Sequence, residues 1–202
     1  LINCNNIMII TDENLIDHIS VTKTIKSIEQ NNLNPILFSE VSVEPTDSSF
    51  KKAIEFAVTN NINGFVGVGG GSSMDTAKAA NLYSTYPADF MTYVNAPIGK
   101  GTPVPGKLKP MIAIPTTTGT GSETTGTAVF DYEEMNAKTA IAHRELRPLI
   151  GLIDPENVRT IPPNVVACSG LDVLCHGLES YTAIPFHTRN KPETPSLRPS
   201  YQ

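Results

Sequence analysis

Short apolar runs alternate with longer mixed stretches over the first 160 residues of the chain. Each run is the length of one buried strand, and the four clearest stand at 7–10, 35–38, 64–68 and 111–114. Two further runs predict strands at 128–130 and 149–153. One amphipathic helix is indicated by apolar residues that share a single helical face: Phe50, Ala53, Ile54, Ala57 and Val58.

Further helices are expected at 13–31, 73–82 and 165–182, and a long loop rich in proline, glycine and lysine at 84–110. Strands that alternate with helices predict a mostly parallel sheet covered on both faces. The alternation stops after Ile161-Pro162-Pro163, so we place a domain boundary near residue 160.

The ends of the chain close no element. The first residue is Leu1 rather than methionine, and the last two, Tyr201 and Gln202, follow a proline-rich stretch. We therefore expect an internal piece of a longer polypeptide, with an α/β domain at 1–160 and the beginning of a helical domain at 161–202.

Composition narrows the classes of protein. Apolar residues make up 40 % of the 202 residues and charged residues 17 %, which is an ordinary globular balance. The net charge of −5, without a basic stripe, argues against a nucleic-acid partner. The chain holds no apolar run of 18 or more residues, so we predict no membrane partner. Three cysteines without a C-x-x-C pair favour a reducing compartment.

The strand expected at 64–68 runs directly into Gly69-Gly70-Gly71, and a helix follows. Glycine has no Cβ, so the backbone there can turn sharply and approach a ligand closely. The free N–H groups and the positive dipole end of the next helix suit a phosphate. A strand, a glycine turn and a helix in this order hold the pyrophosphate of a dinucleotide in α/β folds. The turn matches neither G-x-x-x-x-G-K-[ST] nor G-x-G-x-x-G, and a tight structural turn explains the motif alone about as well.

Two more candidate contacts follow predicted strands. The Thr/Gly segment 115–123 could bind phosphate or ribose oxygens, or it could be a polar loop that satisfies its own backbone. Asp12 could bind a ribose 2′-hydroxyl and repel a 2′-phosphate. Taken alone, Asp12 is better explained as the N-cap of the next helix.

Asp172 and His176 are four residues apart in a predicted helix, so they share one face and could ligate one divalent cation. By itself, a D-x-x-x-H motif is more often an ordinary pair of side chains on the protein surface than a metal site. The neighbouring apolar residues, however, predict a largely buried helix, in which a carboxylate and an imidazole need partners such as a metal: Leu171, Val173, Leu174 and Leu178.

Four motifs occur in a fixed order: Gly69-Gly70-Gly71-Ser72-x-x-Asp75, Pro115-Thr116-Thr117-x-Gly119-Thr120-Gly121-Ser122-Glu123, Asp154-Pro155 and Gly170-x-Asp172-x-x-x-His176-x-x-Glu179. With them the chain resembles the iron-containing alcohol dehydrogenase family over essentially its whole length. The resemblance implies a Rossmann-like, parallel-sheet dinucleotide-binding domain at 1–160. It also implies that 161–202 begin an all-helical metal-binding domain, in a dehydroquinate synthase-like architecture.

The resemblance also assigns roles to residues. Gly70, Gly71 and Ser72 would hold the pyrophosphate of NAD, and Asp12 would meet the adenosine ribose. The remaining cofactor contacts would be Asp75, Thr116, Thr117, Thr120 and Lys138. Asp172 and His176 would be two of four ligands of a divalent metal, iron or zinc. The family's other two ligands are histidines further along, and the one later histidine here, His187, matches neither.

The implied activity is hydride transfer through tightly bound NAD. A 4-hydroxybutyrate-like hydroxy acid would be oxidised and a 2-oxoglutarate-like acid reduced, in mitochondria, and a homo-oligomer is compatible with the resemblance. Two alternatives stay open: an NAD-dependent alcohol dehydrogenase that releases its cofactor, and a truncated, non-catalytic nucleotide-binding product. Because two metal ligands are missing, we expect the 202-residue chain alone to be inactive. Four cations are candidates for binding a substrate carboxylate: Lys100, Lys107, Arg144 and Arg189.

Overall fold

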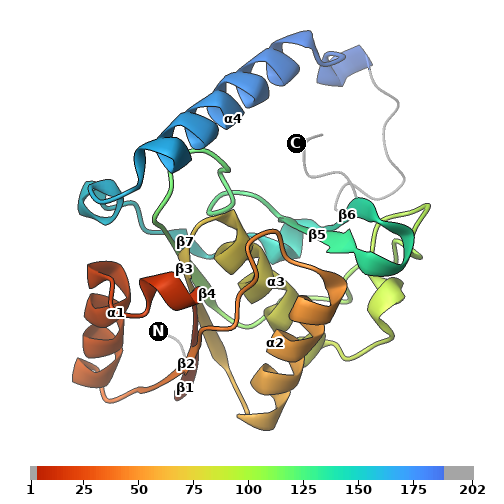
Figure 1. Cartoon of the computed structure of the whole chain (residues 1–202). Helices are drawn as coiled ribbons and strands as arrows, with labels where there is room; N and C mark the ends of the chain where they lie inside the picture. The colour runs from red at the N-terminus through yellow and green to blue at the C-terminus, as the bar shows by residue number, and fades with distance from the viewer. Residues whose placement is uncertain (1–3, 189–202) are drawn as a thin grey trace.

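A five-stranded parallel sheet is the centre of the molecule, in a computed structural model that describes residues 4–188 (Figure 1). The strand order is β2-β1-β3-β4-β7, and each neighbouring pair is parallel. The strands are β1 (Asn6–Ile10), β2 (Asn34–Phe38), β3 (Gly64–Gly69), β4 (Met111–Pro115) and β7 (Ile150–Gly151). The parallel α/β sheet predicted from the alternation of apolar runs is therefore confirmed.

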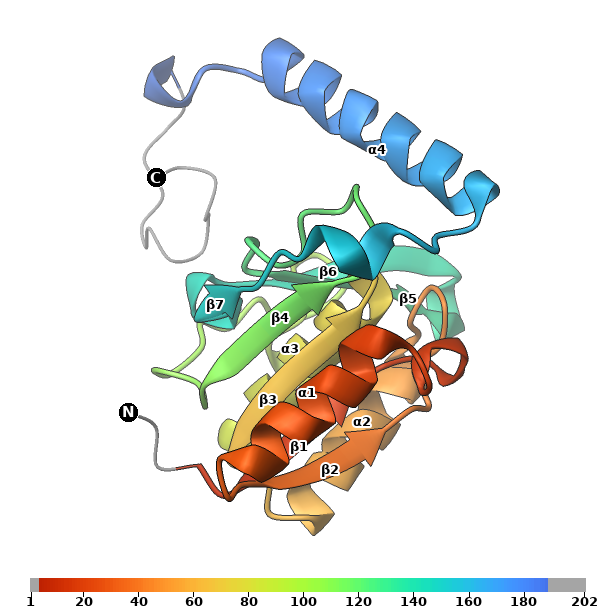
Figure 2. The same ribbon diagram turned by 90° about the vertical axis from the view of Figure 1, so that its left-hand side faces the viewer.

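Helices cover both faces of this sheet (Figure 2). Helix α1 (Ile19–Gln30) lies on one face, while α2 (Asp47–Thr59) and α3 (Gly71–Thr85) lie on the other. Alternation along β1 explains the division, because successive side chains of a strand point to opposite faces. Ile7 and Ile9 pack in the cluster that includes Val21 of α1. Met8 and Ile10 pack in the cluster that includes alanines of α2 and α3.

Local sequence signals explain where the helices begin. Thr46 and Ser49 form a capping box at the start of α2, as Thr46 Oγ1 accepts from Ser49 N and Ser49 Oγ from Thr46 N. The helix expected at 13–31 is divided: a short 3₁₀ turn, η1 (Glu13–Leu15), precedes α1. The division follows from His18, whose side chain accepts from Ser20 N and caps α1 there. The helix expected at 73–82 is present as α3, which is longer than expected at both ends.

A two-stranded antiparallel hairpin packs beside α3. It consists of β5 (Thr127–Tyr132) and β6 (Ala137–Ala142), joined by η3 (Glu133–Met135) and by Asn136 in a left-handed conformation (φ 46°). The sequence predicted β5 but not β6, whose residues do not form a continuous apolar run. The remaining 3₁₀ turns are η2 (Phe90–Thr92), η4 (Arg144–Leu146), η5 (Pro155–Val158) and η6 (Phe186–Thr188).

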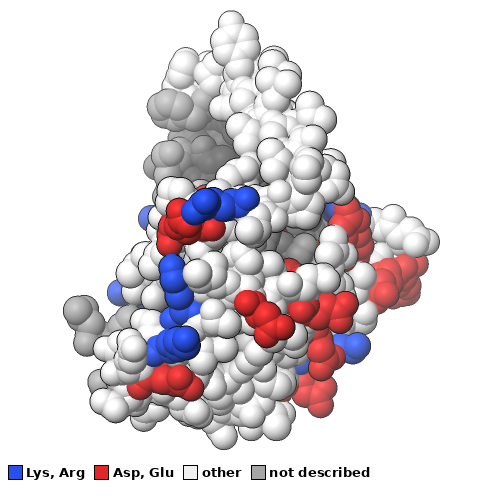
Figure 3. All heavy atoms as spheres, turned by 60° about the vertical axis from the view of Figure 1, so that its left-hand side comes forward, with Lys and Arg blue, Asp and Glu red and all other residues white. Residues whose placement is uncertain are grey.

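Helix α4 (Pro163–Thr182) stands apart from the α/β body, beyond the end of the sheet to which β3 and β4 point (Figures 1 and 2). The sequence predicted a largely buried helix at this place, and that prediction is wrong: Leu171 is 62 % and Leu174 55 % exposed. No residue of α4 is buried, because none of the described segments packs against its apolar face. The region that α4 forms in Figure 3 is almost free of charged side chains. Even so, none of the described helices is long and apolar enough to cross a membrane.

Candidate nucleotide and metal site

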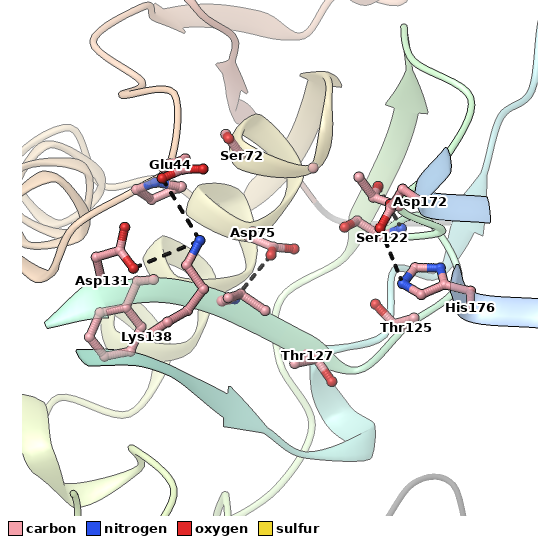
Figure 4. A pocket seen from close by; sticks show the side chains of 15 residues that line it. Glu44, Ser72, Asp75, Ser122, Thr125, Thr127, Asp131, Lys138, Asp172 and His176 are labelled. Atoms are coloured by element: carbon pink, nitrogen blue, oxygen red, sulfur yellow. Dashed lines mark hydrogen bonds and ion pairs between the residues drawn. The ribbon is translucent and has the colours of Figure 1, made fainter. Parts of the chain in front are cut away.

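A cavity of ≈ 540 Å³ opens where several segments of the chain meet, among them the Thr/Gly loop with Thr120 and Ser122 and the segment of Glu44 and Pro45 (Figure 4). The N-terminal turn of α3, the β5–β6 hairpin and the middle of α4 each contribute side chains to its lining. The cavity lies beyond the carboxyl ends of β3 and β4, which is where open parallel sheets bind ligands. The first, second and fourth motifs thus each contribute candidate residues to one cavity: Gly71, Ser72, Asp75, Thr120, Asp172 and His176. Four other candidates, Asp12, Gly70, Thr116 and Thr117, do not line it, and Thr117 borders a neighbouring cavity.

The three glycines at the end of β3 differ in what the fold requires of them. Gly69 has φ +153°, and a Cβ there would collide with the Ser73 side chain, so the fold itself requires glycine. A Cβ on Gly71 would lie 3.0 Å from Thr120 Cγ2, which is tight. A Cβ on Gly70 would meet nothing nearer than Thr117 Cγ2 at 3.4 Å, an ordinary contact. The fold does not require glycine at position 70, so the bare backbone there leaves room for a ligand.

The N-terminus of α3 adds a favourable environment for an anion. Gly70 is the N-cap and offers no side-chain oxygen to the first N–H groups of the helix. Those N–H groups and the positive end of the helix dipole therefore remain available to a ligand. Ser72, in the first turn, lines the cavity and adds a hydroxyl. This arrangement fits a phosphate or pyrophosphate group.

The Thr/Gly segment lies beside the glycine turn because β3 and β4 are in register. Gly69 is paired with Pro115, and Thr116 N donates to Gly69 O at 3.0 Å. The next threonines then lie close to the glycines, as the contacts of Thr117 with position 70 and of Thr120 with position 71 indicate. The structure brings together the two segments that the sequence proposed, although Thr116 itself is buried.

Asp12 follows β1 at the same edge of the sheet. Its Oδ1 accepts from Asn14 N at 2.9 Å and caps η1, so the capping interpretation is confirmed. The turn that Asp12 caps also places Leu15 Cδ1 3.6 Å from the position of a Cβ on Gly69. The cap uses Oδ1, which is one of the two carboxylate oxygens of Asp12.

Asp75 lines the cavity, but its carboxylate is engaged by the protein. Oδ1 accepts from Lys78 Nζ at 3.1 Å, and Oδ2 accepts from Val129 N at 3.0 Å. Burial raises the pKa of the Asp75 carboxyl, and the Lys78 ammonium and the Val129 N–H oppose that rise. Burial likewise lowers the pKa of Lys78, while the Asp75 carboxylate opposes the change. These contacts favour a structural role for Asp75 over direct contact with a cofactor.

Lys138 reaches the cavity from β6, between Glu44 and Asp131 (Figure 4). Its Nζ lies 3.8 Å from Glu44 Oε2 and 3.8 Å from Asp131 Oδ1. Pairs this long and this exposed contribute little to stability, so a ligand could replace them readily. Of the candidate cations for a substrate carboxylate, Lys100, Lys107 and Arg144 do not line this cavity, and Arg189 lies outside the described residues.

Asp172 and His176 border the cavity from α4 (Figure 4). Asp172 Oδ1 lies 3.7 Å from His176 Nε2, and both side chains are exposed. A carboxylate oxygen and an imidazole nitrogen this near are suited to share a divalent metal. The described residues contain no group of three or more His, Cys, Asp or Glu side chains that could hold a metal. The pair thus fits as part of a metal site.

Sequence reasoning missed the partners of the proposed site residues. Lys78 is three residues after Asp75 in a helix, and this spacing could have indicated the ion pair. Nothing in the local sequence could have placed Glu44 beside Lys138, because 94 residues separate them.

Comparison with known proteins agrees with this fold. A family model described as "Iron-containing alcohol dehydrogenase" matches residues 2–155. A curated protein of Xenopus tropicalis, "Hydroxyacid-oxoacid transhydrogenase, mitochondrial", is 55 % identical over 203 residues, covering 100 % of this chain and 44 % of that protein. The chain thus spans less than half the length of this curated relative.

Two solved structures of other proteins are similar to this fold. The iron-containing alcohol dehydrogenase from Thermococcus thioreducens has a TM-score of 0.81 at 30 % identity, with 91 % of this chain and 49 % of that chain covered. The sulfoacetaldehyde reductase from Bifidobacterium kashiwanohense, solved in complex with NAD⁺, has a TM-score of 0.77 at 29 % identity, with 88 % and 45 % covered.

Proposed function

The chain belongs to the iron-containing alcohol dehydrogenase family, and from this premise we propose that it forms the NAD-binding part of a metal-dependent oxidoreductase. We propose further that the enzyme passes hydride from a 4-hydroxybutyrate-like hydroxy acid to a 2-oxoglutarate-like acid through tightly bound NAD. The names of the curated relatives, hydroxyacid-oxoacid transhydrogenases of mitochondria, support a hydroxy acid and an oxo acid as the substrate classes and a mitochondrial location.

One observation carries the nucleotide-binding proposal. Gly70 is a glycine that the fold does not require, and it precedes the uncapped N-terminus of α3, whose first residues, Gly71 and Ser72, line the cavity. Both features suit a pyrophosphate, which needs N–H donors and close approach to the backbone. In this proposal Gly70, Gly71 and Ser72 hold the pyrophosphate.

The other contacts are proposed from the surroundings of the turn. Thr117 and Thr120 contact the same ligand from the adjacent loop, and Thr116 supports that loop from its buried position. Asp12 receives the adenosine ribose, and Lys138 reaches the sugar on the far side by leaving Glu44 and Asp131. Asp75 acts indirectly, by fixing the wall of the cavity.

Asp172 and His176 would hold a divalent metal, iron or zinc, together with ligands outside the described residues. The metal would supply Lewis-acid polarisation of the substrate oxygen, and NAD would supply the hydride acceptor. The residues of the chain orient these two groups: α3 and the Thr/Gly loop bind the cofactor from one side, and α4 presents its carboxylate and imidazole from the other. The cavity between them is where a hydroxy acid would bind.

The binding experiment is calorimetric titration of the purified chain with NAD. We expect one site per chain, and Gly70→Val should abolish binding because its side chain fills the pyrophosphate position. Normal binding by the variant would place the site elsewhere. Retention of NAD through gel filtration would favour the transfer reaction, whereas release would favour the alternative, an alcohol dehydrogenase with exchangeable NAD.

The metal experiment is elemental analysis beside a coupled assay with a 4-hydroxy acid and a 2-oxo acid. We expect weak metal binding and no turnover from the 202 residues alone, because two ligands do not complete a catalytic site. Nucleotide binding without turnover would also suit the non-catalytic alternative. In a longer polypeptide that supplies further ligands, His176→Ala should remove both metal and turnover, while full activity in that variant would contradict the metal assignment.

A further inference from the structure

The Asp75–Lys78 ion pair joins α3 to β5 and the residues just before it, which form the neighbouring wall of the cavity. The Lys78 side chain is 0 % exposed and the Asp75 side chain 9 %. Lys78 Nζ donates to Asp75 Oδ1, to Thr125 Oγ1 at 3.2 Å and to Thr127 O at 2.7 Å. These bonds use all three ammonium donors. Val129 N also donates to Asp75 Oδ2. Asp75 and Lys78 together therefore hold the segment from Thr125 to Val129 against α3.

This segment, residues 125–129, forms one half of the proposed site. Thr125, Thr127 and Val129 line the cavity, and β5 holds β6 by antiparallel pairing, in which Asp131 is opposite Lys138. The other half, Gly71 and Ser72, stands one turn before Asp75 on α3. The ion pair therefore fixes the spacing between the anion-binding turn and Lys138.

Stability alone does not account for a pair this deeply buried. Removing two charges from water is costly, and apolar replacements of buried ion pairs are often as stable or more stable. What a saturated set of charged hydrogen bonds does supply is one defined geometry. That geometry matters to a ligand only if the ligand touches both sides of the cavity.

We propose that Lys78 is a positioning residue for dinucleotide binding. Acting through Asp75, Thr125 and Thr127, it sets the distance that a ligand must span from the N-terminus of α3 to Lys138. The inference rests on the proposed function, because it assumes that the pyrophosphate and the far sugar of NAD occupy these two places. ADP, which ends at the pyrophosphate, does not depend on the spacing, whereas NAD does.

The test compares ADP and NAD by titration calorimetry in the unaltered chain and in Lys78→Met. We expect NAD affinity to fall roughly ten-fold or more while ADP affinity stays within about two-fold. A residue that merely supported the fold would weaken both ligands together. Lys109→Met is the matched control, because Lys109 is a partly buried lysine that bonds Ser84 and does not line this cavity. It should change neither affinity.

Lys78→Met leaves the Asp75 carboxylate buried without its partner, which can prevent folding. The double variant Asp75→Asn, Lys78→Met removes both charges and still breaks the bonds to Thr125 and Thr127. We expect it to fold and to give the same selective loss of NAD. Equal losses for both ligands, or no loss in the double variant, would overturn the positioning role. If the unaltered chain binds neither ADP nor NAD, the proposed function itself is wrong.

Discussion

Gly119 and Ser169 are in direct contact, and this contact connects the Thr/Gly loop to α4. A Cβ on Gly119 would lie 2.8 Å from Ser169 O and 3.1 Å from Ser169 Cα, so no other residue fits there without movement of the backbone. Ser169 lies one turn before Asp172 on the helix. The glycine thus allows α4 to approach the loop where Asp172 and His176 border the cavity.

The first prediction concerns this contact. Gly119→Ala should displace α4 from the loop, because the new methyl group collides with main-chain atoms rather than with a flexible side chain. We expect faster amide hydrogen exchange in 163–182 and unchanged exchange in the central strands. Gly170→Ala is the control, since a Cβ there meets nothing within 4 Å. It should slow exchange slightly, as alanine favours a helix by roughly 0.5–1 kcal/mol over glycine.

The second prediction separates two neighbouring glycines. Gly69→Ala should destabilise the fold by roughly 1–3 kcal/mol, because alanine is strained at φ +153° and crowds Ser73. Gly70→Ala should leave stability within about 0.5 kcal/mol, since its surroundings are open. Yet Gly70→Ala should weaken ADP binding, if the pyrophosphate lies against that backbone. Urea unfolding and ADP titration of both variants measure these effects, and unweakened ADP binding by Gly70→Ala would exclude the proposed contact.

The third prediction concerns the choice between NAD and NADP. The negative charge of Asp12 should repel a 2′-phosphate, so we expect NAD to bind at least about ten-fold more tightly than NADP. Asp12→Asn keeps an oxygen that can cap Asn14 N and removes the charge. The variant should therefore keep its stability, and the ratio of its NAD affinity to its NADP affinity should be smaller than in the unaltered chain. Equal affinities in the unaltered chain would remove Asp12 from this role.

The fourth prediction is a pH dependence of stability. His143 is 5 % exposed, and its burial lowers its pKa below the ordinary value of 6.5. The folded state then binds fewer protons than the unfolded state below pH 6.5, so stability falls as the pH decreases from there toward the lowered pKa. His143→Asn keeps an acceptor for Glu145 N without a titrating ring. The unfolding free energy of this variant should change less between pH 7.5 and 5 than that of the unaltered chain. The two changes should differ by at most about 1.4 kcal/mol for each unit by which folding lowers the pKa of His143.

The fifth prediction concerns a buried hydroxyl. Thr11 Oγ1 is buried and has no hydrogen-bond partner within the described part of the chain. Thr11→Val removes the unsatisfied group and keeps the side-chain shape, so it should stabilise the fold by about 1 kcal/mol. Thr76→Val is the opposite case, because Thr76 Oγ1 donates to Ser72 O at 2.8 Å. Urea denaturation should show a loss of about 1 kcal/mol for Thr76→Val; a loss of the same size for Thr11→Val would mean that Thr11 is satisfied.

Local sequence determined most of the α/β body. Strand β3 was predicted as an uninterrupted apolar run because it is buried on both faces, and the glycines after it marked the turn. The Thr46 cap and the start of α2 were likewise determined within a few residues. These features depend on residues that are close in the chain. Once such residues form a helix or a strand, the relative directions of their side chains are set by that element.

Only the tertiary structure decided how the site is assembled. The spacing of Asp75 and Lys78 allowed an ion pair within α3, but no local pattern indicated that Val129 N would bond the second oxygen of Asp75. Nor did one indicate that Glu44 would lie beside Lys138. It also predicted a buried α4, since an apolar composition does not reveal whether a packing partner is present. Contacts between residues far apart in the chain depend on the register and packing of whole elements, and no local pattern of side chains encodes them.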